Sequence, residues 1–180
     1  MILKKRKSEK ILELESRKNI YEIVIKHAGC HFREIERKSH LPYSTLKYHL
    51  NFLTKHELIF QQKENNKINY FPKDFQTKNL KLLSLLRQKS TRKIILFITF
   101  NDKCYHSDIA RYLSLSQSTI SWHLLKLINS NIIKADRENH KIKYSLAVNL
   151  EEIIKLLIVY KESFLDSLVN RAIEMWEVKG

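Results

Sequence analysis

Two stretches of this sequence place hydrogen-bonding side chains at the spacing of one helical face. In residues 43–56 these side chains are Tyr43, Ser44, Lys47, Tyr48 and Asn51, and in residues 117–128 they are Gln117, Ser118, Ser121 and Trp122. Side chains three and four positions apart lie on the same side of a helix. Hydroxyl, amide and amine groups gathered in this way can read base edges in the major groove of DNA.

Apolar residues predict the helices that would present these groups. Ile120, Leu124 and Leu127 recur at the helical period behind the second set, and Ile109 and Leu113 form a similar stripe in a shorter helix before it. The turn between the two helices contains Leu115 and Ser116, whose hydroxyl is suited to an N-cap. Residues 107–133 therefore have the outline of a helix-turn-helix.

The same outline occurs twice in the chain. A shift of 74 positions lays His31–Tyr70 over Tyr105–Tyr144 without a gap. The identities fall mainly at expected core and turn sites: Ile35 on Ile109, Leu41 on Leu115, Ser44 on Ser118, His49 on His123, Leu50 on Leu124, Ile59 on Ile133 and Tyr70 on Tyr144. The chain thus contains two copies of one structural unit.

Each copy continues into a β-hairpin. Residues 58–62 and 67–71 are β-prone runs on either side of a turn with two asparagines, and residues 133–134 and 141–146 repeat the pattern. A hairpin directly after a helix-turn-helix is the wing of a winged helix. Lys63 and Lys67 lie at the first wing tip, where they can reach a backbone phosphate or a minor groove.

Composition points to a polyanionic partner. The formal net charge is +14, of which residues 17–72 carry +5 and residues 87–147 carry +7, whereas residues 148–180 carry −2. The positive field thus belongs to the repeated units. With two glycines in the chain and no catalytic motif, we expect neither a phosphate-binding loop nor an enzyme, and no cofactor or small-molecule ligand is evident.

The cysteines and histidines admit two interpretations. Cys30-His31 and Cys104-x-His106 are candidate metal ligands, but their spacing does not match a closed zinc site, so buried apolar roles are preferred and no metal is expected. His49 and His123 are either phosphate contacts or histidines packed between helices. Two cysteines and no signal peptide or apolar span predict a cytoplasmic protein without a membrane partner.

The C-terminal segment differs from both copies. Residues 149–176 predict one long helix with an apolar stripe that includes Leu150, Ile153, Leu157, Phe164 and Met175. Such a stripe needs a partner, which is either the rest of the chain or the same helix of a second subunit. We expect the latter, a homodimer.

Together these patterns predict a mainly α fold with small β-hairpins: two tandem winged helix-turn-helix domains plus a long C-terminal helix. The expected boundaries are a first winged helix over residues 1–76, a helical linker over 77–89, a second winged helix over 90–147 and a dimerisation helix over 148–180.

The residues quoted above make the chain similar to a known family. HFREIERKSHLPYSTLKYHLNFLTKHELI and LSQSTISWHLLKLINSNII resemble winged-helix transcription regulators of the ArsR/MarR type, in the tandem form common among archaea. The resemblance covers residues 18–146. It implies that Tyr43, Ser44, Lys47, Tyr48 and Asn51, with Gln117, Ser118, Ser121 and Trp122, read bases, and that Lys63, Lys67, Arg137 and Lys141 hold the backbone from the wings.

The sequence therefore predicts a sequence-specific regulator of transcription that binds double-stranded DNA with two recognition helices and basic wings. Classical members of the family carry one winged helix per subunit, so a palindromic site does not follow for this chain. Trp122 either stacks on the DNA or packs against the first unit. The alternative function is a protein-interaction scaffold in a chromosome or basal transcription assembly.

Overall fold

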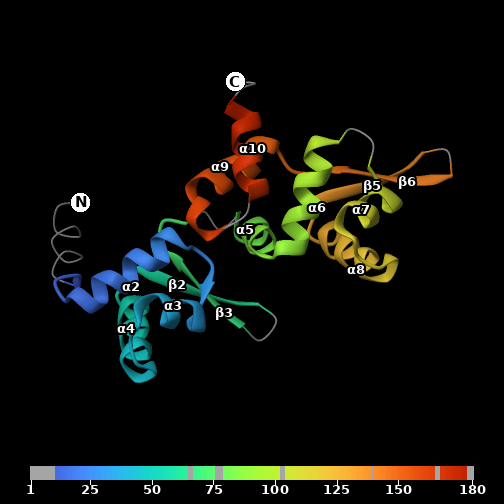
Figure 1. Cartoon of the computed structure of the whole chain (residues 1–180). Helices are drawn as coiled ribbons and strands as arrows, with labels where there is room; N and C mark the ends of the chain where they lie inside the picture. The colour runs from blue at the N-terminus through green and yellow to red at the C-terminus, as the bar shows by residue number, and fades with distance from the viewer. Residues whose placement is uncertain are drawn as a thin grey trace. The chain divides into compact units, whose positions relative to one another are not determined.

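The computed structural model describes residues 11–64, 67–75, 79–101, 104–138, 140–164 and 167–177. The chain forms two compact units, residues 1–77 and residues 78–180, called unit one and unit two below (Figure 1). None of the described helices combines the length and the apolar character needed to cross a membrane.

Unit one is a winged helix. Its elements are listed in chain order: α2 (Glu15–Lys26), β1 (Cys30–His31), α3 (Phe32–Ser39), α4 (Tyr43–Lys55), β2 (Ile59–Glu64) and β3 (Lys67–Pro72). The three strands form an antiparallel sheet in the order β1-β3-β2, with Cys30 opposite Tyr70 and Ile59 opposite Pro72. The predicted hairpin is therefore present, and its turn at residues 65–66 lies outside the described residues.

The core of unit one lies between its helices and the sheet. Ile20 and Val24 of α2, Ile35 of α3, and Leu46 and Leu50 of α4 are fully buried. These residues recur at helical spacing, so one face of each helix is apolar and the three faces meet. The opposite face of α4 is left to solvent.

Unit two repeats this architecture. Its first elements are, in chain order, α5 (Leu80–Arg87), α6 (Lys89–Phe100), β4 (Cys104–Tyr105), α7 (His106–Leu113), α8 (Gln117–Ile128), β5 (Ile133–Glu138) and β6 (Lys141–Leu146). Its sheet has the matching order β4-β6-β5, and Cys104 lies opposite Tyr144. The predicted duplication and the mainly helical fold with two tandem helix-turn-helix domains are confirmed.

The turns and caps explain where the recognition helices begin. His40 and Ser114 occupy matching left-handed positions, with φ of 55° each, immediately after α3 and α7. Pro42 is the N-cap of α4, whereas the Ser116 hydroxyl accepts a hydrogen bond from the Thr119 amide at 3.2 Å, as predicted. The turn is therefore set by backbone geometry in both units and by a side-chain cap only at α8.

Helix α6 begins at Lys89, so Ser90 lies inside the helix and does not cap it. Gln88 is the N-cap of α6, and it lies immediately between α5 and α6. The Thr91 hydroxyl instead donates to the carbonyl groups of Leu85 and Gln88. These bonds fix the corner between the two helices.

The prediction of one long C-terminal helix is wrong. The segment forms α9 (Leu150–Val159), a 3-10 turn η2 (Lys161–Ser163) and α10 (Ser167–Glu177). Helix α10 packs against α9 and α6, and Tyr160 and Phe164 are buried where the chain reverses. The apolar stripe is largely covered by unit two itself because the break lets the two halves pack on the same core.

Candidate nucleic-acid interface

The outer face of α4 carries the five predicted base-reading side chains of unit one. All five are exposed, with Tyr43 at 58% and Tyr48 at 60% of their maximal accessible surface. Leu46, Leu50 and Leu53 anchor the opposite face in the core. The helix thus presents its polar side to solvent without loss of packing.

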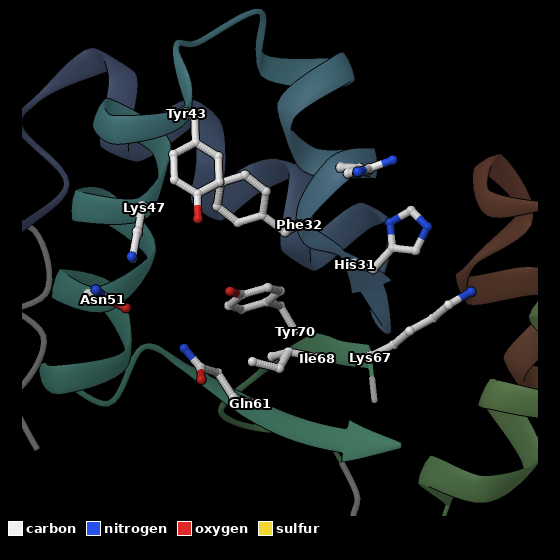
Figure 2. Close-up of a pocket in the computed structure, with 10 residues that line it drawn as sticks. His31, Phe32, Tyr43, Lys47, Asn51, Gln61, Lys67, Ile68 and Tyr70 are labelled. Carbon is white, nitrogen blue, oxygen red and sulfur yellow. The ribbon is translucent and has the colours of Figure 1, made fainter. Parts of the chain in front are cut away.

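A cleft opens between this face and the wing (Figure 2). Its volume is about 630 Å³. The unit-one cleft has three sides, which are the end of β1 with the start of α3, the helix α4, and the hairpin β2–β3. Its lining residues are His31, Phe32, Arg33, Tyr43, Lys47, Asn51, Gln61, Lys67, Ile68 and Tyr70. Three predicted α4 residues and the predicted wing residue Lys67 are therefore brought together.

The unit-one cleft is electropositive. Arg33, Lys47 and Lys67 line it, and no carboxylate is among the lining residues. The ion pairs found among the described residues use other lysines. Three cations around one hollow, with the amides of Asn51 and Gln61 between them, provide donors for phosphate oxygens.

Six of the ten lining residues were not predicted as DNA contacts, and three of these are Arg33, Gln61 and His31. Arg33, Gln61 and His31 come from the start of α3, from β2 and from β1, and only the tertiary fold brings them to α4. The Nδ1 atom of His31 accepts a hydrogen bond from the Glu34 amide at 3.1 Å, so the neutral ring carries its proton on Nε2. Cys30 and His31 form the short strand β1, which pairs with β3 of the wing.

Aromatic rings form the inner wall of the unit-one cleft. The rings of Phe32 and Tyr43 are tilted at 50° with centroids 4.8 Å apart, and the Lys47 ammonium lies 5.8 Å from the Tyr43 ring (Figure 2). Tyr70 is buried beneath them, and this desolvation raises the pKa of its phenol. The wall thus holds Lys47 near the opening. Lys63, by contrast, is exposed on β2 and does not line the cleft.

The matching face of unit two is chemically different. Gln117, Ser118, Ser121 and Trp122 are exposed, but two of their hydroxyls are bonded within the protein. The Ser121 hydroxyl donates to the Gln117 carbonyl at 3.0 Å and lies 2.9 Å from His106 Nε2, while the Ser118 and Ser116 hydroxyls are 3.1 Å apart. On the wing, Arg137 and Lys141 are exposed. The Lys141 ammonium lies 5.7 Å from the Tyr105 ring.

The two matching histidines, His49 and His123, belong to the recognition helices α4 and α8. His49 is 5% exposed, and the Nδ1 atoms of His49 and His123 are buried without a hydrogen-bond partner. Burial lowers the pKa of both imidazoles, and the positive charge of Arg17 adds to this effect at His49, as that of Lys126 does at His123. These features support the packed, neutral histidine over the phosphate contact.

Cys30 and Cys104 are buried thiols. Within the described ranges, no cluster of three or more histidine, cysteine or acidic side chains is placed to hold a metal ion. Cys104 contributes a weak hydrogen bond instead, with its sulfur 3.2 Å from the Asn101 carbonyl. Both cysteines act as small core residues in the short strands.

Comparison with known families finds one match that lies mainly in unit one and one match in unit two. Residues 14–83 match a family of N-terminal HTH domains. Residues 89–135 match the family described as "Bacterial regulatory protein, arsR family". Each match thus falls mainly on one of the two helix-turn-helix domains, and the family matched by the second is described as one of regulatory proteins.

The chain also has a long relative. It is 35% identical over 136 residues to an uncharacterized HTH-type transcriptional regulator of Methanocaldococcus jannaschii, and the match covers 76% of this chain. The same match covers 34% of the length of that relative.

Among solved structures, HlyU from Vibrio cholerae N16961 is similar over 47% of this chain and 90% of its own, with 21% identity and a TM-score of 0.41. Its reduced form gives a TM-score of 0.40 at the same identity, covering 47% of this chain and 87% of its own.

Proposed function

Because the chain carries two tandem winged helix-turn-helix domains, of which the second matches the arsR regulatory family, we propose that it is a regulator of transcription that binds double-stranded DNA in the cytoplasm. The unit-one cleft is the observation that best supports this function. It combines three cations, two amides and the exposed face of a recognition helix on one side of a small domain.

The proposed mechanism is occupancy of a DNA site. Arg33, Lys47 and Lys67 replace counterions on the sugar-phosphate backbone, which provides affinity. Asn51 and Ser44 contact base edges, which provides sequence preference. In unit two the corresponding proposal places Gln117 and Trp122 at the bases.

The direct test measures binding of the full chain to duplex DNA. Genomic fragments retained by the protein supply the binding sequence, and fluorescence anisotropy then gives the dissociation constant at several salt concentrations. Lys47→Ala is expected to weaken binding and to reduce the magnitude of the negative slope of log K against log salt by about 0.9. Lys155→Ala, at an exposed lysine of the acidic C-terminal segment, is the control and is expected to change neither value. Unaltered binding by Lys47→Ala contradicts the proposed role of α4.

One observation favours the alternative of a protein-interaction scaffold. Trp122 and Leu125 of α8 are 59% and 58% exposed, and such neighbouring apolar side chains are common where proteins meet. A scaffold is expected to bind duplex DNA weakly and without sequence preference. Recovery of a defined sequence motif from the retained fragments decides between the two functions.

We also propose that the chain forms a homodimer through its C-terminal segment. Ile158 and Val159 at the end of α9 are 46% and 66% exposed and are the apolar positions that the core of unit two leaves uncovered there. A second copy of the chain is the proposed partner.

A further inference from the structure

The two copies of the winged helix differ at most of the polar positions that line the unit-one cleft. The shift of 74 residues places Ser107 at the position of Arg33, Ser121 at that of Lys47, Leu125 at that of Asn51 and Ala135 at that of Gln61. Of the three cleft cations, only Lys67 has a basic counterpart, Lys141. The duplicated scaffold is thus preserved while the donors on it are not.

Two polar side chains of α8, Ser121 and Lys126, form contacts within unit two. The Ser121 hydroxyl, at the position of Lys47, is already bonded to the Gln117 carbonyl and to His106. Lys126, near the end of α8, donates to Gln88 Oε1 at 2.7 Å and lies 5.5 Å from the Trp122 ring. The hydroxyl of Ser121 and the ammonium of Lys126 are thus tied by these contacts to other residues of unit two.

Residues 87–147 of unit two carry a higher net charge than residues 17–72 of unit one, but much of this charge lies away from α8. Four of its cations fall within residues 87–93, around the start of α6. Of these, Arg92 is buried, where it donates to the Leu86 carbonyl at 2.7 Å and lies over the Phe164 ring. On the outer face of α8, exposed Trp122 and Leu125 take the places of Tyr48 and Asn51.

We propose that unit one alone grips the DNA backbone, and that unit two adds little to the electrostatic part of the affinity. This inference rests on the proposed DNA binding and deepens it by assigning the phosphate contacts to one copy. Arg33, Lys47 and Lys67 line the unit-one cleft, and no carboxylate is among its lining residues. The matching surface of unit two retains one of these cations and gains apolar side chains. Net charge, which is +5 over residues 17–72 and +7 over residues 87–147, is a misleading guide to which copy binds.

The test transplants the residues of unit two into unit one. The full chain with Arg33→Ser, Lys47→Ser, Asn51→Leu and Gln61→Ala carries a cleft whose residues the second copy already accommodates on the same fold. Binding to a random-sequence duplex of about 30 base pairs is measured over a range of salt, because backbone contacts need no particular sequence. The slope of log K against log salt is negative, and its magnitude is expected to decrease by about 1.8, since two cations are removed and each phosphate contact contributes about 0.9.

The matched control removes two cations from unit two. The variant Arg137→Ser with Lys141→Ser takes two of the exposed cations from the second wing and is expected to leave the slope nearly unchanged. A further variant, Lys47→Arg with Lys67→Arg, keeps the charge of the cleft and is expected to keep the slope. Thermal melting of each variant reports whether it folds. If the transplant melts early, the single substitutions Arg33→Ser and Lys47→Ser provide the measurement.

The outcomes separate this inference from the function on which it rests. An equal fall in slope for the transplant and the unit-two control overturns the assignment to unit one and leaves DNA binding in place. A fall confined to the control reverses the assignment. A wild-type chain that does not bind duplex DNA at low salt overturns the proposed function and this inference with it.

Discussion

At the scale of single residues, neighbours on one helix have separate tasks. Lys47 and Asn51 are one turn apart on α4, and both line the unit-one cleft. A lysine holds a phosphate by charge, whereas an asparagine distinguishes a base by paired hydrogen bonds. Affinity and sequence preference can therefore be changed independently at this face.

Asn51→Ala tests this separation. The variant is expected to lose about 1–3 kcal/mol of discrimination at one base pair, because the amide is the group that pairs with an adenine edge. The salt slope should remain that of the wild type, since no charge is removed. Selection from a randomised duplex pool gives the preference, and anisotropy gives the slope. An unchanged preference shows that Asn51 does not contact a base.

His49 makes the stability of unit one depend on pH. Burial, followed by the charge of Arg17, lowers its pKa below the ordinary 6.5, so the unfolded chain binds a proton where the folded chain does not. The free energy of unfolding is therefore expected to decrease as the pH falls below about 6.5 toward the lowered pKa.

Denaturant unfolding at pH 7.5 and 5.5 measures this dependence. His49→Gln removes the titrating group and is expected to reduce the difference in unfolding free energy between the two pH values. His140→Asn, at an exposed histidine, is the control. An equal pH effect in the wild type and in His49→Gln would show that other groups cause the acid sensitivity.

At the scale of elements, the two recognition helices begin in different ways. Helix α4 follows Pro42 and has no side-chain cap, while α8 is capped by Ser116, whose hydroxyl also lies 2.7 Å from that of Thr119. The cap satisfies an amide at the start of α8 that would otherwise lack a partner within the helix. The start of α8 is thus fixed by a side chain and that of α4 by the restricted backbone of proline.

Ser116→Ala is expected to lower the free energy of unfolding by about 1 kcal/mol, the usual cost of losing a serine N-cap. Chemical denaturation followed by circular dichroism measures the change. Ser107→Ala, at an exposed serine of α7, serves as the comparison and should cost less. If the two variants are equally stable, the hydroxyl contributes nothing beyond the backbone turn.

At the scale of the whole molecule, the C-terminal segment completes unit two and is also the proposed dimer contact. Its reversal at Tyr160 and Phe164 buries most of the apolar stripe, which reduces the surface left for a second copy. Ile158 and Val159 remain exposed at the end of α9. The dimer proposal therefore depends on a short apolar patch rather than on a long helix.

Light scattering with size-exclusion chromatography tests the proposal. The wild-type chain is expected to have twice the mass of 21.6 kDa, and Ile158→Lys with Val159→Lys is expected to have the mass of one chain. Charged side chains at an apolar contact oppose association because they must lose their hydration. A wild-type mass of one chain shows that α9 does not join two copies.

The sequence by itself determined the two winged helices. The repeat at 74 positions predicted the order of helices and hairpins. The helical period of Ile120, Leu124 and Leu127 predicted which face of α8 is buried, because that period follows from local geometry. It also identified the outer face of α4. The comparisons with known families agree with this assignment.

Only the tertiary structure decided what surrounds that face and how the chain ends. Arg33, Gln61 and Lys67 come together because β1 pairs with β3 and the hairpin turns toward α4, and no local pattern encodes that meeting. The break after Val159 was likewise hidden, since a continuous apolar stripe fits one long helix as well as two helices folded on a common core. The periodicity of a sequence specifies which side of an element is apolar, but the packing partner is chosen by contacts between residues far apart in the chain.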